Sequence, residues 1–161
     1  MELKAEKLKN KLLDLYNNIK KQNNYSPDFV NKYKEEAINF FSENNIPGTN
    51  IENWRGTNLE EILQDDYIFE VKPEKDIDIS KIFKCEINNF EKLFFANYNG
   101  YNIYENNPII EFDNGVIAGS LNSAIEKYPE IVNKYYTKSK ASTYNSFTAI
   151  NTALATDGLF I

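Results

Sequence analysis

The sequence predicts an α+β fold in which an N-terminal helical hairpin precedes a small mixed region of strands and short helices. Three patterns predict it: apolar residues at helical spacing before residue 45, short alternating runs between residues 67 and 104, and strand-then-helix signals between residues 115 and 155. With 161 residues, 42% of them hydrophobic, the chain is long enough to bury a core and is not expected to be disordered.

The first two predicted helices are amphipathic. Residues 3–22 carry one apolar stripe, formed by Leu8, Leu12, Leu15, Tyr16 and Ile19. A second helix is expected after Ser26-Pro27-Asp28, which offers a capping hydroxyl, a proline at the first helical position and an acid in the first turn. Its apolar face is Val30, Tyr33, Ala37, Phe40 and Phe41. A short polar turn joins these helices, so they should pair antiparallel.

The middle of the chain is predicted to alternate between turns and short strands. Thr57 and Glu60 have the spacing of a capping box for a short helix. Strand-like runs follow over residues 67–71, 82–87 and 92–98, separated by polar connectors. Asn99-Gly100 is a strong hairpin signal, so residues 101–104 should return beside the preceding run.

The last third should contain two strands and three helices. Residues 115–120 form a strand that ends at Ser120, which caps a helix over residues 121–127, and another helix covers residues 129–136. A Ser/Thr/Lys linker over 138–145 precedes a helix over 147–155, capped by Asn145 or Ser146. Asp157-Gly158 then turns the chain into Leu159-Phe160-Ile161, an expected unpaired strand too short to complete a sheet edge.

Composition excludes several kinds of site. The net charge is −6, which argues against nucleic-acid and anionic-membrane partners, and no apolar run is long enough to span a bilayer. Cys85 is the lone cysteine, which fits a reducing compartment, here the cytoplasm. Histidine is absent. Ser–His and Cys–His catalysis, a cysteine-based zinc site and an iron–sulfur cluster held by this chain alone are therefore excluded.

The remaining polar groups have plain structural interpretations. The acidic pairs Asp65-Asp66 and Asp76/Asp78 could hold a divalent ion or act as acid and base, but solvated turns are favoured. Cys85 is expected to be buried and inert, although Lys84 lies beside it. No catalytic, cofactor-binding or metal-binding residue is predicted.

Three further features also have structural interpretations. Gly115 and Gly119 belong to no phosphate-binding motif. The tyrosines Tyr98, Tyr101 and Tyr104 are expected to pack across one hairpin face rather than to stack on a ligand. Trp54, the only tryptophan, is expected to be largely buried, packing its linker onto the helices.

Three segments, in this order, resemble the SufB/SufD family of iron–sulfur cluster assembly proteins. Residues 46–59 resemble the "P…EEWKYTDL" segment of SufD-like proteins: Trp54, Thr57 and Leu59 match, Arg55 replaces a lysine, and Gly56 replaces an aromatic residue. Residues 116–130 and 147–161 resemble the family's "V…SL.EAL…P" and "F.ALNTA…DG.FI" segments. The Trp54 segment favours SufD over SufB.

The resemblance implies a fold and a division of the chain. It implies an N-terminal helical region over residues 1–64 and a small α+β region over 65–137. Residues 138–161 would then form a linker, a helix and the first strand of a right-handed parallel β-helix core, at which the chain is truncated. The family's ATPase contact lies C-terminal to that core.

The implied function is that of a non-catalytic scaffold segment in the SufB–SufC–SufD complex. SufB and SufC would be partners in the full-length context, and the complex, rather than this segment, would handle iron–sulfur clusters and ATP. The exposed end, residues 147–161, is expected to cause self-association. Two alternatives come from the residues alone: a free-standing α+β adaptor domain that binds a peptide on its sheet edge, and a small hydrolase that uses the acidic pairs.

Overall fold

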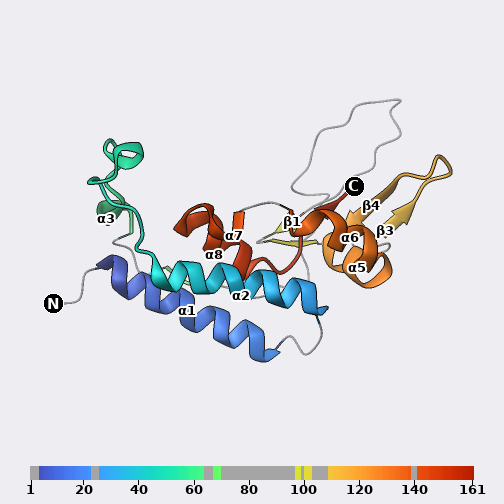
Figure 1. The fold of residues 1–161 in the computed structure, drawn as a ribbon, viewed down its shortest axis with the longest axis horizontal. Helices are drawn as coiled ribbons and strands as arrows, with labels where there is room; N and C mark the ends of the chain where they lie inside the picture. Colours follow the sequence, from blue (N-terminus) through green and yellow to red (C-terminus); the bar gives the residue numbers. More distant parts are fainter. Residues whose placement is uncertain are drawn as a thin grey trace, which may run out of the picture. The chain divides into compact units, whose positions relative to one another are not determined.

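The computed structural model describes residues 4–22, 26–63, 67–69, 97–98, 100–102, 109–138 and 141–161 (Figure 1). The chain divides into two compact units. The helical unit comprises Met1–Phe69 and Glu130–Ala155, and the sheet unit comprises Glu70–Pro129 and Thr156–Ile161. These units group segments that contact one another in space. They do not test the division into consecutive regions 1–64, 65–137 and 138–161, which stays a prediction.

The helical unit begins with the predicted hairpin. Helix α1 spans Lys4–Gln22 and α2 spans Asp28–Glu43, and the two lie side by side (Figure 1). Their cross-contacts show that they run antiparallel. Near the start of α1, the Lys9 ammonium donates to the Ser42 carbonyl oxygen at 2.8 Å, and near its end the Lys20 ammonium contacts Glu35 at 2.7 Å.

A third helix completes the core between them. Helix α8 spans Ser146–Leu154 and packs against α2 and α1. The core consists of Tyr16, Ala37, Ile38, Phe41, Ala149, Ile150 and Ala153, with the half-buried Leu12, Leu13, Phe40, Ile46 and Leu154 around it. Ala149 and Ala153 lie one turn apart and are almost fully buried, so their small side chains let α8 approach α2 closely. Contrary to the expectation of an exposed end over residues 147–161, this last helix is covered by α1 and α2.

Two short helices accompany this core. Helix α6 spans Pro129–Tyr136, as predicted, and α7 spans Ala141–Tyr144. The second falls within the segment predicted to be a polar linker. Its Ser142 is 2% exposed because α7 packs against α2 and α8. Composition indicated a linker here, but tertiary contact buries this turn and makes it helical.

The helix caps follow the sequence signals in part. Asn145 caps α8: its side chain accepts from the Thr148 backbone N–H at 2.9 Å, and the Thr148 hydroxyl accepts from the Asn145 N–H at 3.1 Å. The predicted Ser26 cap of α2 is wrong, because Pro27 holds the N-cap position and no side chain caps it. The Ser26 carbonyl instead accepts from the Asn31 side-chain amide at 2.8 Å.

The Trp54 segment forms two short helical turns. A 3-10 turn, η1, spans Glu52–Trp54, and α3 spans Leu59–Ile62. Because α3 begins at Leu59, Asn58 rather than the predicted Thr57 immediately precedes it. Residues 67–69 do not form the strand predicted there.

The sheet unit contains a three-stranded antiparallel sheet of order β3-β4-β5, with β3 at Ile109–Glu111, β4 at Ile117–Ser120 and β5 at Leu159–Phe160. Strand β3 was not predicted, although Asn114-Gly115 before β4 is a turn signal, and Gly115 adopts a φ of 83° there. The strand expected over 115–120 and the helix after it are confirmed, as β4 and as α5 at Leu121–Lys127.

Strand β5 corrects the prediction of an unpaired end. Gly119 faces Phe160 and Ser120 faces Leu159 across an antiparallel register, so β5 does form a sheet edge. The backbone bond from the Leu121 N–H to the Gly158 carbonyl, 2.9 Å, extends this pairing beyond the strand. Two residues are enough to form this sheet edge because β4 also pairs with β3 and because Asp157, in the turn before β5, is hydrogen-bonded to Ser120 and Asn122.

A separate hairpin confirms the Asn99-Gly100 signal. Strands β1 at Asn97–Tyr98 and β2 at Tyr101–Asn102 pair antiparallel, and Gly100 adopts a φ of 82°, which favours glycine. Residues 82–87 and Tyr104 lie outside the described residues.

The predicted α+β class with N-terminal helices is confirmed. Among the described helices, none combines the length and hydrophobicity that a membrane crossing needs.

Candidate functional site

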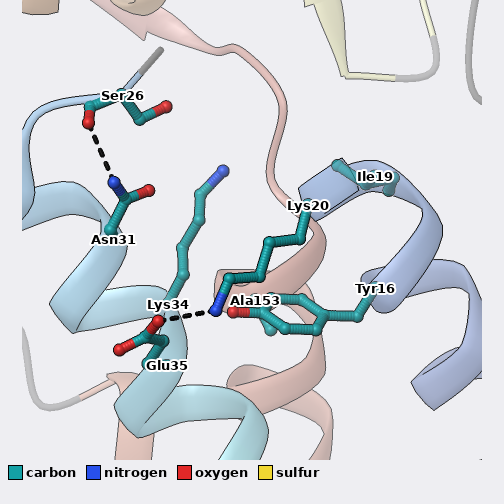
Figure 2. Close-up of a pocket in the computed structure, with 8 residues that line it drawn as sticks. All are labelled: Tyr16, Ile19, Lys20, Ser26, Asn31, Lys34, Glu35 and Ala153. Atoms are coloured by element: carbon teal, nitrogen blue, oxygen red, sulfur yellow. Dashed lines mark hydrogen bonds and ion pairs between the residues drawn. The ribbon is translucent and has the colours of Figure 1, made fainter. Parts of the chain in front are cut away.

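A small hollow opens between α1 and α2, next to α8 (Figure 2). It measures about 40 Å³ and is lined by Tyr16, Ile19, Lys20, Ser26, Asn31, Lys34, Glu35 and Ala153. We call it the α1–α2 hollow. Helical periodicity explains its walls: Tyr16, Ile19 and Lys20 lie within one turn of α1, and Asn31, Lys34 and Glu35 do so on α2.

Lys34 extends into this hollow from α2 (Figure 2). Its ammonium donates to the Ala155 carbonyl, the residue that follows the last turn of α8. Burial lowers the pKa of Lys34, because loss of solvent penalises the ammonium form. A cation at the C-terminal end of a helix is favourable for the helix dipole, so this contact ties α2 to the end of α8.

An ion pair crosses the mouth of the hollow. The Lys20 ammonium on α1 contacts the Glu35 carboxylate on α2 at 2.7 Å, with both side chains about half exposed (Figure 2). The hydrogen bond that Lys20 donates to the Glu35 carboxylate raises the pKa of Lys20. Beyond this pair lies an open groove of about 320 Å³, which shares Tyr16, Lys20 and Glu35 with the hollow. The ion pair therefore borders both the hollow and the groove.

In the sheet unit, the Asp157 carboxylate is hydrogen-bonded both to the last residue of β4 and to the first turn of α5. Its Oδ1 accepts from the Ser120 hydroxyl and from the Asn122 backbone N–H, both at 2.9 Å. The Ser120 oxygen in turn accepts from the Ser123 N–H at 3.1 Å, which confirms Ser120 as the cap of α5. We call this the Ser120–Asp157 junction. The sequence predicted the turn at Asp157-Gly158. It did not predict that the Asp157 carboxylate binds Ser120, the helix cap that lies 37 residues earlier.

In the helical unit, Trp54 stacks on Phe147. Their ring centroids are 5.3 Å apart and the rings are inclined by 36°. Trp54 is half-buried, which is less than the predicted extent. The contact nevertheless attaches the Trp54 segment to the start of α8, which is the packing role expected of it.

The other sequence-predicted residues do not converge. Tyr98 and Tyr101 face each other across the β1–β2 register. Gly115 and Gly119 lie in the β3–β4 hairpin, away from any helix start except that of α5. Cys85 and the acidic pairs at 65–66, 76 and 78 lie outside the described residues. In the part of the chain that the structure describes, no three His, Cys, Asp or Glu side chains gather as metal ligands.

Comparison with known families identifies the chain. Residues 6–161 match the family described as the SufBD protein N-terminal region. The chain therefore belongs to the SufB/SufD family of iron–sulfur cluster assembly proteins, of which it represents the N-terminal region. No curated protein and no solved structure gives a significant match.

The segments that carry the family resemblance are joined by the contacts described above. Trp54 in the first segment stacks on Phe147 in the third, within the helical unit. Ser120 in the second bonds Asp157 in the third, within the sheet unit. The family-like residues are thus packing and capping residues, and no reactive groups converge at these two contacts.

Proposed function

We propose that this chain is the N-terminal segment of a SufD-like scaffold component of the SufB–SufC–SufD complex, and that it is non-catalytic by itself. The observation that carries the proposal is the family match over residues 6–161. The resemblance of residues 46–59 to the tryptophan segment of SufD-like proteins supports SufD over SufB. The scaffold role agrees with the use of Trp54, Ser120 and Asp157 for packing and capping.

The finer parts of the proposal come from the family. Residues 138–161 would lead into the right-handed parallel β-helix core, and SufB and SufC would contact other parts of the full-length protein. The complex would act in the cytoplasm. Iron–sulfur clusters are its product, assembled with the help of ATP hydrolysis by SufC, and this segment would bind neither.

Complementation tests the SufD assignment. The full-length gene that contains this chain would be introduced into a strain lacking SufD and into one lacking SufB, and the activity of an iron–sulfur enzyme would be measured. Restoration only in the strain lacking SufD is expected. Restoration only in the strain lacking SufB would contradict the SufD assignment while leaving family membership intact.

Reconstitution tests the non-catalytic role. The purified chain would be incubated anaerobically with ferrous iron and sulfide, then mixed with SufC and passed over a sizing column. With one thiol and no imidazole in the sequence, we expect no stoichiometric cluster absorbance. We also expect SufC to elute separately, and a stable complex of SufC with this chain would overturn the assignment of the ATPase contact to another part of the protein.

A further inference from the structure

We propose that the α1–α2 hollow binds a small monovalent oxyanion of the size of formate, with Lys34 and Lys20 as its cationic ligands. This proposal does not depend on the scaffold function. It depends on the polar groups that line the hollow, on its size, and on the ion pair at its mouth.

The lining of the hollow is rich in donors. Two ammonium groups, from Lys34 and Lys20, and the hydroxyls of Ser26 and Tyr16 border it, against one carboxylate, Glu35. The Asn31 side-chain amide lies on the same wall and donates to the Ser26 carbonyl. With two cationic side chains against one carboxylate, the lining carries a net positive charge, which favours an anion.

Lys34 supplies the central charge. An ammonium has three N–H donors, and among the described residues the hydrogen bond of Lys34 goes to the Ala155 carbonyl. Because Lys34 lines the hollow, its remaining donors can bind a charged oxygen there, which would form shorter and stronger bonds than a neutral one. Burial lowers the pKa of this ammonium, and a bound anion would raise it again.

The volume limits the ligand. A site of about 40 Å³ has room for roughly three water molecules, since each needs about 10–15 Å³ of such space. A three- or four-atom planar anion fits that space, whereas hydrated phosphate with its second charge does not. The lining charges also sum to one excess positive charge, from two lysines and Glu35, which matches a monovalent ion.

Glu35 competes with the proposed ligand. Its carboxylate holds Lys20 at 2.7 Å across the mouth of the hollow. An anion inside would attract Lys20 and be repelled by Glu35, so the ion pair has to loosen when the anion binds. Removing the Glu35 charge should therefore strengthen binding, an effect that a purely structural ion pair would not produce.

Backbone amide NMR of the intact chain provides the test. Sodium formate would be titrated at constant ionic strength, balanced with the bulky buffer salt sodium HEPES. Saturable shifts are expected at the amides of Asn31, Lys34 and Ala153. Inorganic phosphate at the same ionic strength should give no saturable shift at these positions. Linear, unsaturated shifts with formate, or equal saturation by phosphate, would overturn the proposal.

Three variants sharpen the test. Lys34→Met should weaken formate binding by about tenfold or more, because it removes a charge-assisted bond. Lys32→Met, at an exposed lysine on the same helix, is the matched control and should leave affinity unchanged. Glu35→Gln should tighten binding by about threefold, since a repulsive charge is removed. If Lys34→Met does not fold, the Glu35→Gln result decides: unchanged or weaker binding would refute the site.

Discussion

Removal of the Asp157 carboxylate should destabilise the sheet unit. In the Ser120–Asp157 junction this carboxylate accepts two bonds from across the fold, from the Ser120 hydroxyl and the Asn122 N–H, both at 2.9 Å. It also accepts from the adjacent Gly158 N–H at 2.8 Å. Asp157→Ala therefore loses the group that holds the start of α5 beside the turn into β5.

The size of the effect follows from these bonds. A hydrogen bond to a charged group contributes about 1.5–3 kcal/mol, and loss of a helix cap costs about 0.5–2 kcal/mol. Asn122 is exposed, so water replaces part of its lost bond, and Ser120 still caps α5 through Ser123. Asp157→Ala should therefore lower the free energy of unfolding by about 2–3 kcal/mol, and Asp157→Asn, which keeps one oxygen acceptor, by about 1 kcal/mol.

Urea unfolding followed by circular dichroism measures the overall cost, and amide hydrogen exchange localises it. Exchange at Asn122 should accelerate in Asp157→Ala while exchange in the α1–α2 hairpin stays unchanged. Glu126→Ala removes an exposed carboxylate from α5 itself and serves as the control, with an expected change within about 0.5 kcal/mol. If Asp157→Ala unfolds at the same urea concentration as Glu126→Ala, the junction does not stabilise the fold.

Three further predictions concern the helical unit. Replacing Phe41, which is 1% exposed, by alanine should lower the free energy of unfolding by about 3–5 kcal/mol. Replacing the half-buried Phe40 by alanine should lower it clearly less, so equal losses in melting temperature would contradict the described core. Because burial lowers the pKa of Lys34, its charged form costs stability below the folded pKa, and this cost disappears as the pH rises to the unfolded value of 10.5. Between about pH 8 and about pH 11 the wild type should therefore gain stability relative to Lys34→Met in urea unfolding, and parallel curves for the two proteins would refute this. Phe147→Ala should shift Trp54 fluorescence to the red and increase its quenching by iodide, whereas an unchanged spectrum would show that the stacking in the structure does not shield the indole.

Local signals alone were enough to predict much of the fold. The apolar stripes located α1 and α2, and Asn99-Gly100 located the β1–β2 hairpin. Of the two residues named as possible caps of α8, Asn145 is the cap. Each of these depends on residues fewer than about five positions apart, whose geometry is set by the helix or turn period itself. For the same reason the order of segments that resembles the SufB/SufD family could be recognised without coordinates.

What the sequence left undecided depends on residues far apart in the chain. Leu159 and Phe160 gave no sign of their pairing with β4, and the Asp157 turn signal did not reveal that its carboxylate binds Ser120, 37 residues earlier. No sequence pattern singled out Lys34. Only the end of α8, 121 residues further along, buries it against the Ala155 carbonyl. Periodicity specifies which face of an element is apolar, but the partner of that face is chosen by packing, and packing exists only in the tertiary structure.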